Sequence, residues 1–193
     1  LSIMAGHSLI YDRTDGFSGS LQGFPSDAIQ EFNGGGVLNP SVSGSASEVP
    51  WQSFFGRLNY NFREKYLFEF NVRRDGSSKF GPQNRYGTFP SFGVGWNISN
   101  EEFMRHNKLV SGLKIRATWG KSGNDRIGNY IYEQNYNTSL DYTLGNGTVV
   151  PGVALTSLAN PLITWETIEQ YDVGLDAAFL KNRLFLNVDY FQR

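Results

Sequence analysis

The sequence predicts an all-β fold, as a segment of an antiparallel, up-and-down transmembrane β-barrel. Three observations lead to this fold class. Apolar and polar residues alternate with a period of two along several segments, which is typical of strands whose two faces meet different surroundings. The connections between these segments alternate between long and short along the chain. The segments have about the nine to eleven residues that a tilted strand needs to cross a bilayer.

The first clear strand pair lies between residues 54 and 72. Even positions of 54–62 hold Phe, Gly, Leu, Tyr and Phe, and the odd positions include Arg57, Asn59 and Asn61. Even positions of 66–72 hold Tyr, Phe, Phe and Val. Only residues 63–65 separate the two segments, which predicts a tight hairpin.

The same alternation recurs in residues 92–98, 113–120, 167–179 and 184–191, and residues 1–11 allow one more strand. Short links lie at 63–65 and 180–183. A medium link at 99–111 has Ser99 and Glu102 spaced as a capping box, which predicts one helical turn. Long links lie at about 13–53, 74–90 and 121–165. The last can hold two further strands, at 129–136 and 140–145, and an even number keeps the up-and-down order.

The charged residues of these segments predict which face points inward. A Lys or Arg facing lipid at mid-depth costs roughly 2–4 kcal/mol, whereas in a wet lumen most of that cost disappears. Glu169 is the one clear exception in this assignment, near the long-loop end, where the penalty falls. The candidate lumen-facing residues are Arg57, Glu69, Arg73, Lys114, Arg116, Asp172, Asp176 and Asp189.

Aromatic residues gather near both predicted rims, as expected for the two belts at membrane interfaces. Those near the short turns are Phe62, Tyr66, Trp96 and Phe179; those near the long loops are Trp51, Phe54, Trp119, Tyr171 and Tyr190.

Composition narrows the function classes. The net charge of −1 and pI of about 6.2 give no bulk attraction to nucleic acid. The absence of Cys excludes disulfides and thiolate chemistry. His7 and His106 are too few and too far apart to predict a metal site. No cofactor and no enzymatic activity are predicted.

Several long motifs, in matching order and spacing, resemble the barrel of SusC/RagA-type TonB-linked outer-membrane transporters of Bacteroidetes. They are "GRLNYNFREKYL" at 56–67, "RRDGSSKFG" at 73–81, "GTFPSFGVGWNISNEEF" at 87–103, "LKIRATWGKSGN" at 113–124, "LANPLITWE" at 158–166 and "VGLDAAFLKNRLFLNVDYF" at 173–191. The resemblance covers about residues 52–193, and residues 1–51 carry no matching motif.

The resemblance implies a 22-stranded barrel with an N-terminal plug, working with a SusD-like surface lipoprotein. Such a pair takes up oligosaccharides or peptides, and the TonB complex energises import through the plug. The chain is then about seven to nine strands from the C-terminal half of a barrel in the bacterial outer membrane, in contact with its lipid. On this interpretation residues 1–193 are a fragment lacking signal peptide, plug and final strands.

The long loops then face the cell exterior, where polar residues shape the barrel mouth and touch the lipoprotein. Exposed aromatics there are candidates for stacking on sugar rings, and packing of loop against loop is the alternative. The candidate loop or ligand-contact residues are Asp75, Arg85, Tyr86, Tyr130, Tyr132 and Trp165.

Two other interpretations stay open at this point. A soluble β-sandwich that binds carbohydrate would bury Tyr60 and Phe68 against a second sheet. A glycosidase would use Glu166, Asp172 and Asp176 as paired carboxylates, although lumen-lining charge explains the same residues.

Overall fold

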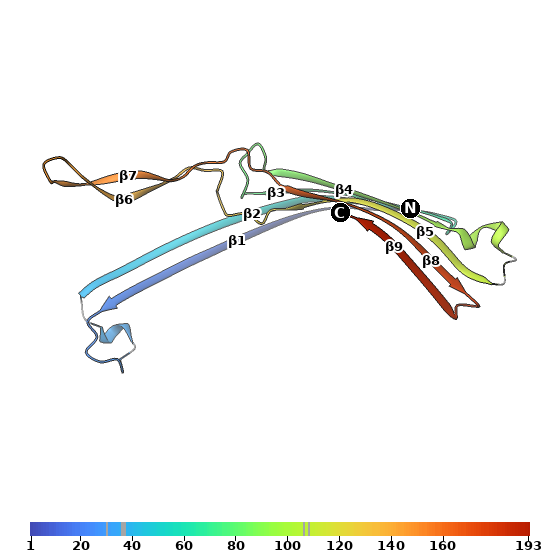
Figure 1. Ribbon diagram of the computed structural model, residues 1–193, viewed down its shortest axis with the longest axis horizontal. Coiled ribbons are helices and arrows are strands. Elements are labelled where there is room, and N and C mark those ends of the chain that lie inside the picture. Colours follow the sequence, from blue (N-terminus) through green and yellow to red (C-terminus); the bar gives the residue numbers. More distant parts are fainter. Residues whose placement is uncertain (30, 36–37, 106, 108) are drawn as a thin grey trace. The chain divides into compact units, whose positions relative to one another are not determined.

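The computed structural model describes residues 1–29, 31–35, 38–105, 107 and 109–193, and its regular secondary structure is almost entirely β (Figure 1). Two compact units are present: one comprises Leu1–Leu9 with Trp51–Arg193, and the other Ile10–Pro50. The strands are β1 Ser2–Gln22, β2 Leu38–Phe62, β3 Tyr66–Ser77, β4 Tyr86–Asn97, β5 Val110–Asn124, β6 Asn135–Thr143, β7 Val149–Ser157, β8 Glu166–Phe179 and β9 Leu184–Gln192. The short 3₁₀ helices are η1 Phe32–Gly34, η2 Ile98–Asn100 and η3 Glu102–Met104.

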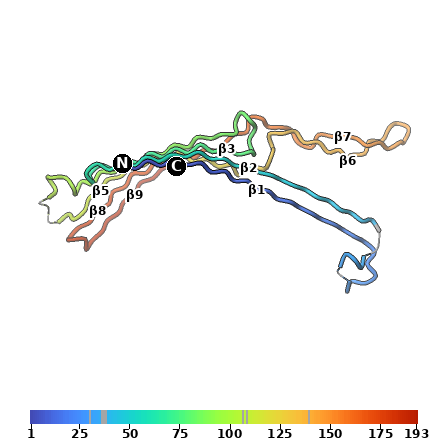
Figure 2. The backbone as a smooth tube through the Cα atoms, turned by 180° about the vertical axis from the view of Figure 1, so that it is seen from behind, coloured from blue at the N-terminus to red at the C-terminus, as the bar shows by residue number. Residues whose placement is uncertain are grey.

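Seven of these strands form one sheet in the order β1-β2-β3-β4-β5-β8-β9. Each registered pair from β2 to β9 is antiparallel, and the chain trace runs up and down from one strand to its neighbour (Figure 2). Among the described residues, β6 and β7 pair only with each other. The predicted all-β, up-and-down fold is therefore confirmed, as an open sheet in this chain.

The long links are shorter than predicted, because strands extend into them. β1 runs to Gln22 and β2 begins at Leu38, so the link expected at 13–53 shrinks to residues 23–37. β3 and β4 likewise reduce the link at 74–90 to residues 78–85. These extensions are rich in Ser and Gly. Backbone hydrogen bonds build a ribbon without an apolar face, so hydrophobic alternation does not reveal it.

The third long link does contain two strands, as predicted, but their bounds differ. They occupy Asn135–Thr143 and Val149–Ser157 instead of 129–136 and 140–145. The medium link holds helical turns, but the capping box is wrong. Ser99 lies inside η2, and neither η2 nor η3 has a side-chain hydrogen bond at its N-cap.

Both tight turns adopt left-handed backbone. In the three-residue link Arg63 and Glu64 have φ of 53° and 56°, as in a type I′ turn, and the Lys65 N–H donates to the Phe62 carbonyl oxygen at 3.0 Å. At the other turn three consecutive residues, 180–182, have positive φ. The Ser111 hydroxyl oxygen accepts hydrogen bonds from the backbone N–H groups of Lys181, at 2.8 Å, and Asn182, at 3.3 Å. These contacts hold a conformation that is costly for non-glycine residues.

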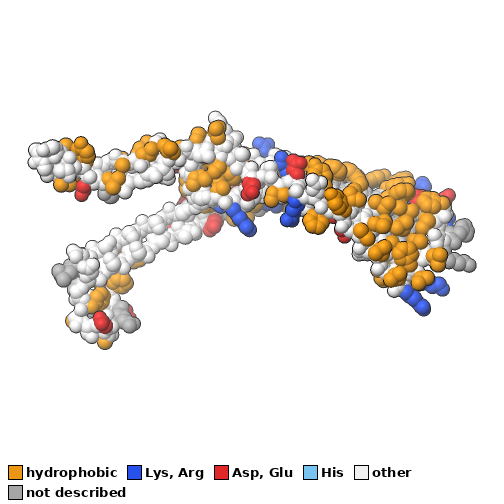
Figure 3. Space-filling model, in the orientation of Figure 1, with side chains coloured by type: hydrophobic (Ala, Val, Ile, Leu, Met, Phe, Trp, Pro, Cys, Tyr) orange, Lys and Arg blue, Asp and Glu red, His pale blue; other side chains and the backbone are white. Residues whose placement is uncertain are grey.

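Within the described part of the chain, no second layer covers the apolar face of the sheet. Tyr60, Phe70 and Leu186 are 44%, 39% and 47% exposed. Figure 3 shows hydrophobic side chains gathered over the part of the sheet near the short turns. A soluble sandwich would bury these residues, so that interpretation is not supported by this structure.

Candidate functional site: two faces and a loop cluster

Cross-strand register divides the sheet into two faces, because directly paired residues point to the same side. The pairs Arg57↔Asn71, Asn71↔Ser91 and Ser91↔Gly120 run along one face, here called the charged face. The pairs Lys114↔Asp176, Thr118↔Asp172 and Gly174↔Asp189 continue it. All eight candidate lumen-facing residues lie on the charged face. The opposite side is called the apolar face.

On the charged face, Arg116 joins three carboxylates from two neighbouring strands. Its guanidinium lies 3.1 Å from Asp172 and 3.3 Å from Asp176, and it also pairs with Asp189. Gly174 stands between Arg116 and Asp189 in the ladder. A Cβ at this glycine would come within 2.5 Å of the Arg116 Cζ, so the missing side chain makes room for the ion pairs.

This arrangement argues against paired catalytic carboxylates. Asp172 and Asp176 are held by one guanidinium, and the Glu166 carboxylate accepts a hydrogen bond from the Asn124 amide at 2.8 Å. Among the described residues no group of three His, Asp or Glu side chains is placed to hold a metal ion. His106 lies outside the described residues.

A second network on the charged face connects β2, β3 and β4. The Arg57 Nε donates to the Asn71 side-chain oxygen at 2.7 Å. The Asn71 amide donates in turn to Glu69, at 2.8 Å, and to Ser91, at 3.4 Å. Basic, acidic and amide side chains therefore line this part of the sheet and are hydrogen-bonded to one another.

Nearer the loops, Arg73 anchors the long-loop end of β3. It pairs with Asp75 at 2.7 Å, donates to the Ser53 hydroxyl at 3.0 Å, and lies 5.0 Å from the Trp51 ring. Asp75 and Ser53 are buried. Asp75 is thus committed to a structural ion pair and is not open to a ligand.

The loops at this end pack around an aromatic core, here called the loop cluster. Its buried members are Phe80, Phe89 and Trp165, with Trp51, Ile127 and Ile163 packed against them. The Trp165 ring centroid lies 4.9 Å from that of Phe80 and 5.3 Å from that of Phe89. Its indole N–H donates to the Arg85 carbonyl oxygen at 3.2 Å.

Trp165 is only 8% exposed, so the expected exposed ring is not found and loop packing describes it instead. Tyr132 lies against Gly81, next to Phe80 of the loop cluster, and both Tyr130 and Tyr132 are half-buried, with ring centroids 6.4 Å apart. Burial raises the pKa of the Tyr132 hydroxyl, and the neighbouring Glu133 charge adds to this. The Arg85 Nε is buried without a hydrogen-bond partner among the described residues.

Sequence reasoning missed Phe89 and Ser77. Phe89 points to the charged face, opposite to its neighbours Pro90 and Phe92 in the alternation. Ser77 is fully buried and donates to Asp125 at 3.0 Å, which ties the β3 end to the next long link. The one available signal was that Phe89 in "GTFPSF" stands at an odd position, whereas Pro90 and Phe92 stand at even positions.

Tyr86 lies on the apolar face and not in the loop cluster, because it pairs with Gly76 in the register that contains Arg74 and Phe70. The Arg74 guanidinium carbon lies 5.0 Å from the Tyr86 ring centroid. The Tyr86 hydroxyl donates to the Gln52 side-chain oxygen at 3.0 Å, and the Gln52 amide lies 3.1 Å from the His7 ring nitrogen.

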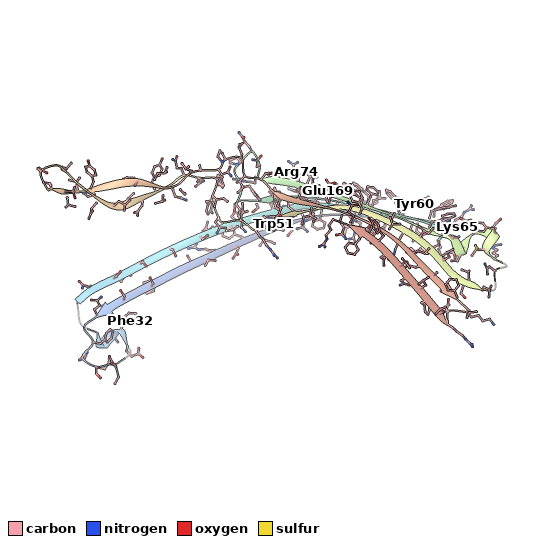
Figure 4. All side chains as sticks on the ribbon, in the orientation of Figure 1. Phe32, Trp51, Tyr60, Lys65, Arg74 and Glu169 are labelled. Atoms are coloured by element: carbon pink, nitrogen blue, oxygen red, sulfur yellow. The ribbon has the colours of Figure 1, made fainter. Side chains whose placement is uncertain are left out.

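Polar residues end the apolar face at a similar height on six strands. Counted from the short-turn end, the first polar side chain follows eight to ten residues later, as from Tyr66 to Arg74 on β3 and from Phe179 to Glu169 on β8. This set, here called the polar belt, comprises Gln52, Arg74, Thr88, Lys121, Glu169 and Gln192. Figure 4 shows Arg74 and Glu169 farther from the turn at Lys65 than Tyr60 is.

Aromatic side chains bound the apolar face at its short-turn end, and the carboxylate of Glu101 accepts hydrogen bonds from residues there. Tyr66 stacks on Trp96 with ring centroids 6.5 Å apart. Glu101 accepts hydrogen bonds from Lys65 at 2.8 Å, Tyr66 at 2.9 Å and Trp96 at 3.2 Å. The Lys65 bond, followed by the Tyr66 bond, lowers the pKa of the Glu101 carboxyl.

Residues 5–193 match the family described as TonB dependent receptor-like, beta-barrel. TonB-dependent receptor P3 of Formosa agariphila is 36% identical over 192 residues, which are 99% of this chain and 19% of that protein. TonB-dependent receptor SusC of Bacteroides thetaiotaomicron is 38% identical over 144 residues, or 73% of this chain and 14% of that protein.

Solved structures agree with these relatives. The RagAB peptide importer in its closed-closed state aligns with a TM-score of 0.84 and 31% identity, over 98% of this chain and 20% of that chain. The chain spans about a fifth, or less, of the length of the relatives that it matches. No helix of the described residues is long and apolar enough to cross a membrane.

Proposed function

Because the chain belongs to the TonB-dependent receptor family of β-barrels, we propose that its sheet is part of the wall of an outer-membrane importer. The observation that carries this proposal is that the apolar face ends at a similar height on six strands. Eight to ten residues at about 3.4 Å each extend about 27–34 Å along a strand. With strands tilted by about 40°, this gives about 21–26 Å of depth, close to the roughly 25 Å apolar band of such barrels.

A protein partner would be a poor cover for this face. Partner surfaces are irregular, so the change from apolar to polar would fall at different heights on different strands. A lipid layer is flat, and it requires the change at one level on every strand. The similar height on β2, β3, β4, β5, β8 and β9 therefore favours lipid as the cover.

The charged face is then the lumen wall, and the loop cluster stands at the extracellular mouth. An open depression on this face includes Arg57, Asn71, Arg73 and Ser91 next to the loop cluster member Phe89. Groups of both signs near the mouth suit hydrogen bonding to oligosaccharides or to peptide backbones. Tyr130, Tyr132 and Arg85 are the loop residues that we propose for contact with substrate or partner.

We extend the proposal to the rest of the assembly, on the basis of membership in the family. The chain belongs to the C-terminal half of the barrel, and a plug elsewhere in the protein contacts the TonB complex. A SusD-like lipoprotein is the proposed partner for substrate capture, supported by the likeness to SusC and to the RagAB peptide importer. The proposed role is import, and no enzymatic step is assigned to this wall.

Cysteine labelling in intact outer membranes tests the proposal. Single Cys at Phe68 or Val72 should react with a lipid-soluble maleimide, and Cys at Glu69 or Asn71 with a water-soluble one. All four residues lie between positions 68 and 72 of β3, so labelling of its two faces is compared within the same part of one strand. The reverse pattern, or equal labelling of all four, would exclude a lipid-facing apolar face.

A further inference from the structure

We propose that Arg74, stacked on Tyr86 within the polar belt, binds the phosphate of an anionic glycolipid in the outer leaflet. The inference rests on the proposed function, because it places the polar belt at the level of the lipid headgroups. It assigns a ligand to the outward side of the sheet, away from the lumen.

The charge of Arg74 supports this ligand. Among the described residues no carboxylate lies within ion-pair distance of its guanidinium, whereas Lys121 in the same belt lies 3.7 Å from Glu169. An uncompensated guanidinium at a membrane surface attracts phosphate, and it can bind two phosphate oxygens at once.

The neighbours of Arg74 hold it in place. Gly76 leaves room for the Tyr86 ring, since a Cβ there would lie 2.5 Å from Tyr86 Cε1. The ring therefore crosses β3 to reach Gln52, which is joined to His7. Arg74 stacks over this fixed ring at 5.0 Å. Stacking covers a guanidinium face, and the N–H groups at its edge remain suited to bind a phosphate.

The depth of Arg74 also fits a headgroup. It follows Phe70 by four residues, or about 14 Å along the strand and about 10 Å in depth at a 40° tilt. Phe70 is midway between Tyr66 and Arg74, hence near the centre of the apolar band. The long Arg side chain then ends near the boundary, where Lys and Arg reach polar headgroups.

The test uses the full-length transporter, delipidated in detergent and titrated with bisphosphorylated lipid A under native mass spectrometry. Arg74→Gln should reduce the bound glycolipid about tenfold. Arg63→Gln is the matched control, because Arg63 also stacks on an aromatic ring, Phe62, but lies at the short-turn end. It should leave binding unchanged. Glu169→Gln, which frees Lys121, should increase binding.

Three results would overturn the inference: equal binding by Arg74→Gln and wild type, equal binding of dephosphorylated lipid A, or displacement by equimolar inorganic phosphate. The last would indicate a free phosphate site. Heat-modifiable gel mobility reports folding. If Arg74→Gln does not fold, Arg74→Lys replaces it in the test. Its expected loss of glycolipid affinity is about threefold, and an unchanged affinity would count against the inference. The cysteine labelling above tests the proposed function separately.

Discussion

A lysine placed at the centre of the apolar face should destabilise the barrel far more than one placed on the adjacent residue. Ala117 and Thr118 are neighbours in β5 and lie on the apolar and charged faces respectively. Ala117 is four residues from both Leu113 and Lys121, the two ends of the apolar stretch of its strand. That distance is about 14 Å along the strand and about 10 Å in depth from either boundary.

The expected cost of Ala117→Lys is therefore the midplane value, about 2–4 kcal/mol. This corresponds to roughly a 30- to 900-fold change in the folding equilibrium constant. Thr118→Lys should cost less than about 0.5 kcal/mol, because an exposed lumen side chain stays hydrated and lies beside Asp172. Ala117→Leu controls for side-chain size.

The assay is guanidinium unfolding of the full-length protein in short-chain lipid vesicles, followed by tryptophan fluorescence. Ala117→Lys should lower the unfolding midpoint with an unchanged slope, since the slope reports the surface exposed on unfolding. If Thr118→Lys lowered the midpoint as much as Ala117→Lys, the assignment of the two faces would be wrong.

Three further substitutions test other contacts. Gly174→Ala should displace the Arg116 guanidinium and weaken its ion pairs, for a loss of up to about 1 kcal/mol in thermal stability, because these pairs are partly exposed. Glu101→Gln should flatten the acid side of the stability-against-pH curve. A lowered folded pKa gives stability that is present above the ordinary carboxyl pKa and is lost as pH falls through the folded value. Trp165→Ala should cost about 3–5 kcal/mol of local stability in the loop cluster and speed its proteolysis.

Each of these substitutions has a matched control. Gly112→Ala adds a Cβ 3.4 Å from that of Ala178, an ordinary contact, and should be neutral. Glu102→Gln changes an exposed carboxylate in the same link. Leu162→Ala removes a side chain that is 79% exposed beside the loop cluster. If a control substitution changed stability as much as the test substitution it is matched with, the physical reason given for the test substitution would be wrong.

Alternation allowed both faces of the sheet to be predicted, because a period of two is a local property of each strand. Arg57, Glu69 and Asp189 could be assigned to one face without knowing their neighbours. The Arg116 cluster could not, since it depends on which strand follows which in space and on the gap left by Gly174. The ribbon extensions of β1 and β2 were missed because both of their sides meet water, so no hydrophobic pattern marks them.

The loop cluster illustrates a different limit. Trp165 lies far in sequence from Phe80 and Phe89, and each of the three is flanked by residues typical of exposed loops. Their burial follows from how the strands bring the links together, which local composition does not encode. Tyr86 was misassigned for a related reason: the end of the link could not be located, so its place on β4 and its face were unknown.

The two faces together make a further demand on the complete protein. Arg116 adjoins Ala117 in the chain, so an ion-paired guanidinium lies at the depth where the opposite face is most apolar. Under the proposed function that guanidinium needs a hydrated space, and lipid must be kept from it. A flat sheet in a bilayer would expose both sides to hydrocarbon and leave the edges of β1 and β9 unpaired, at several kcal/mol for each open group. Closure by further strands meets both requirements, so the ions on the charged face and the unpaired edges call for the same structure.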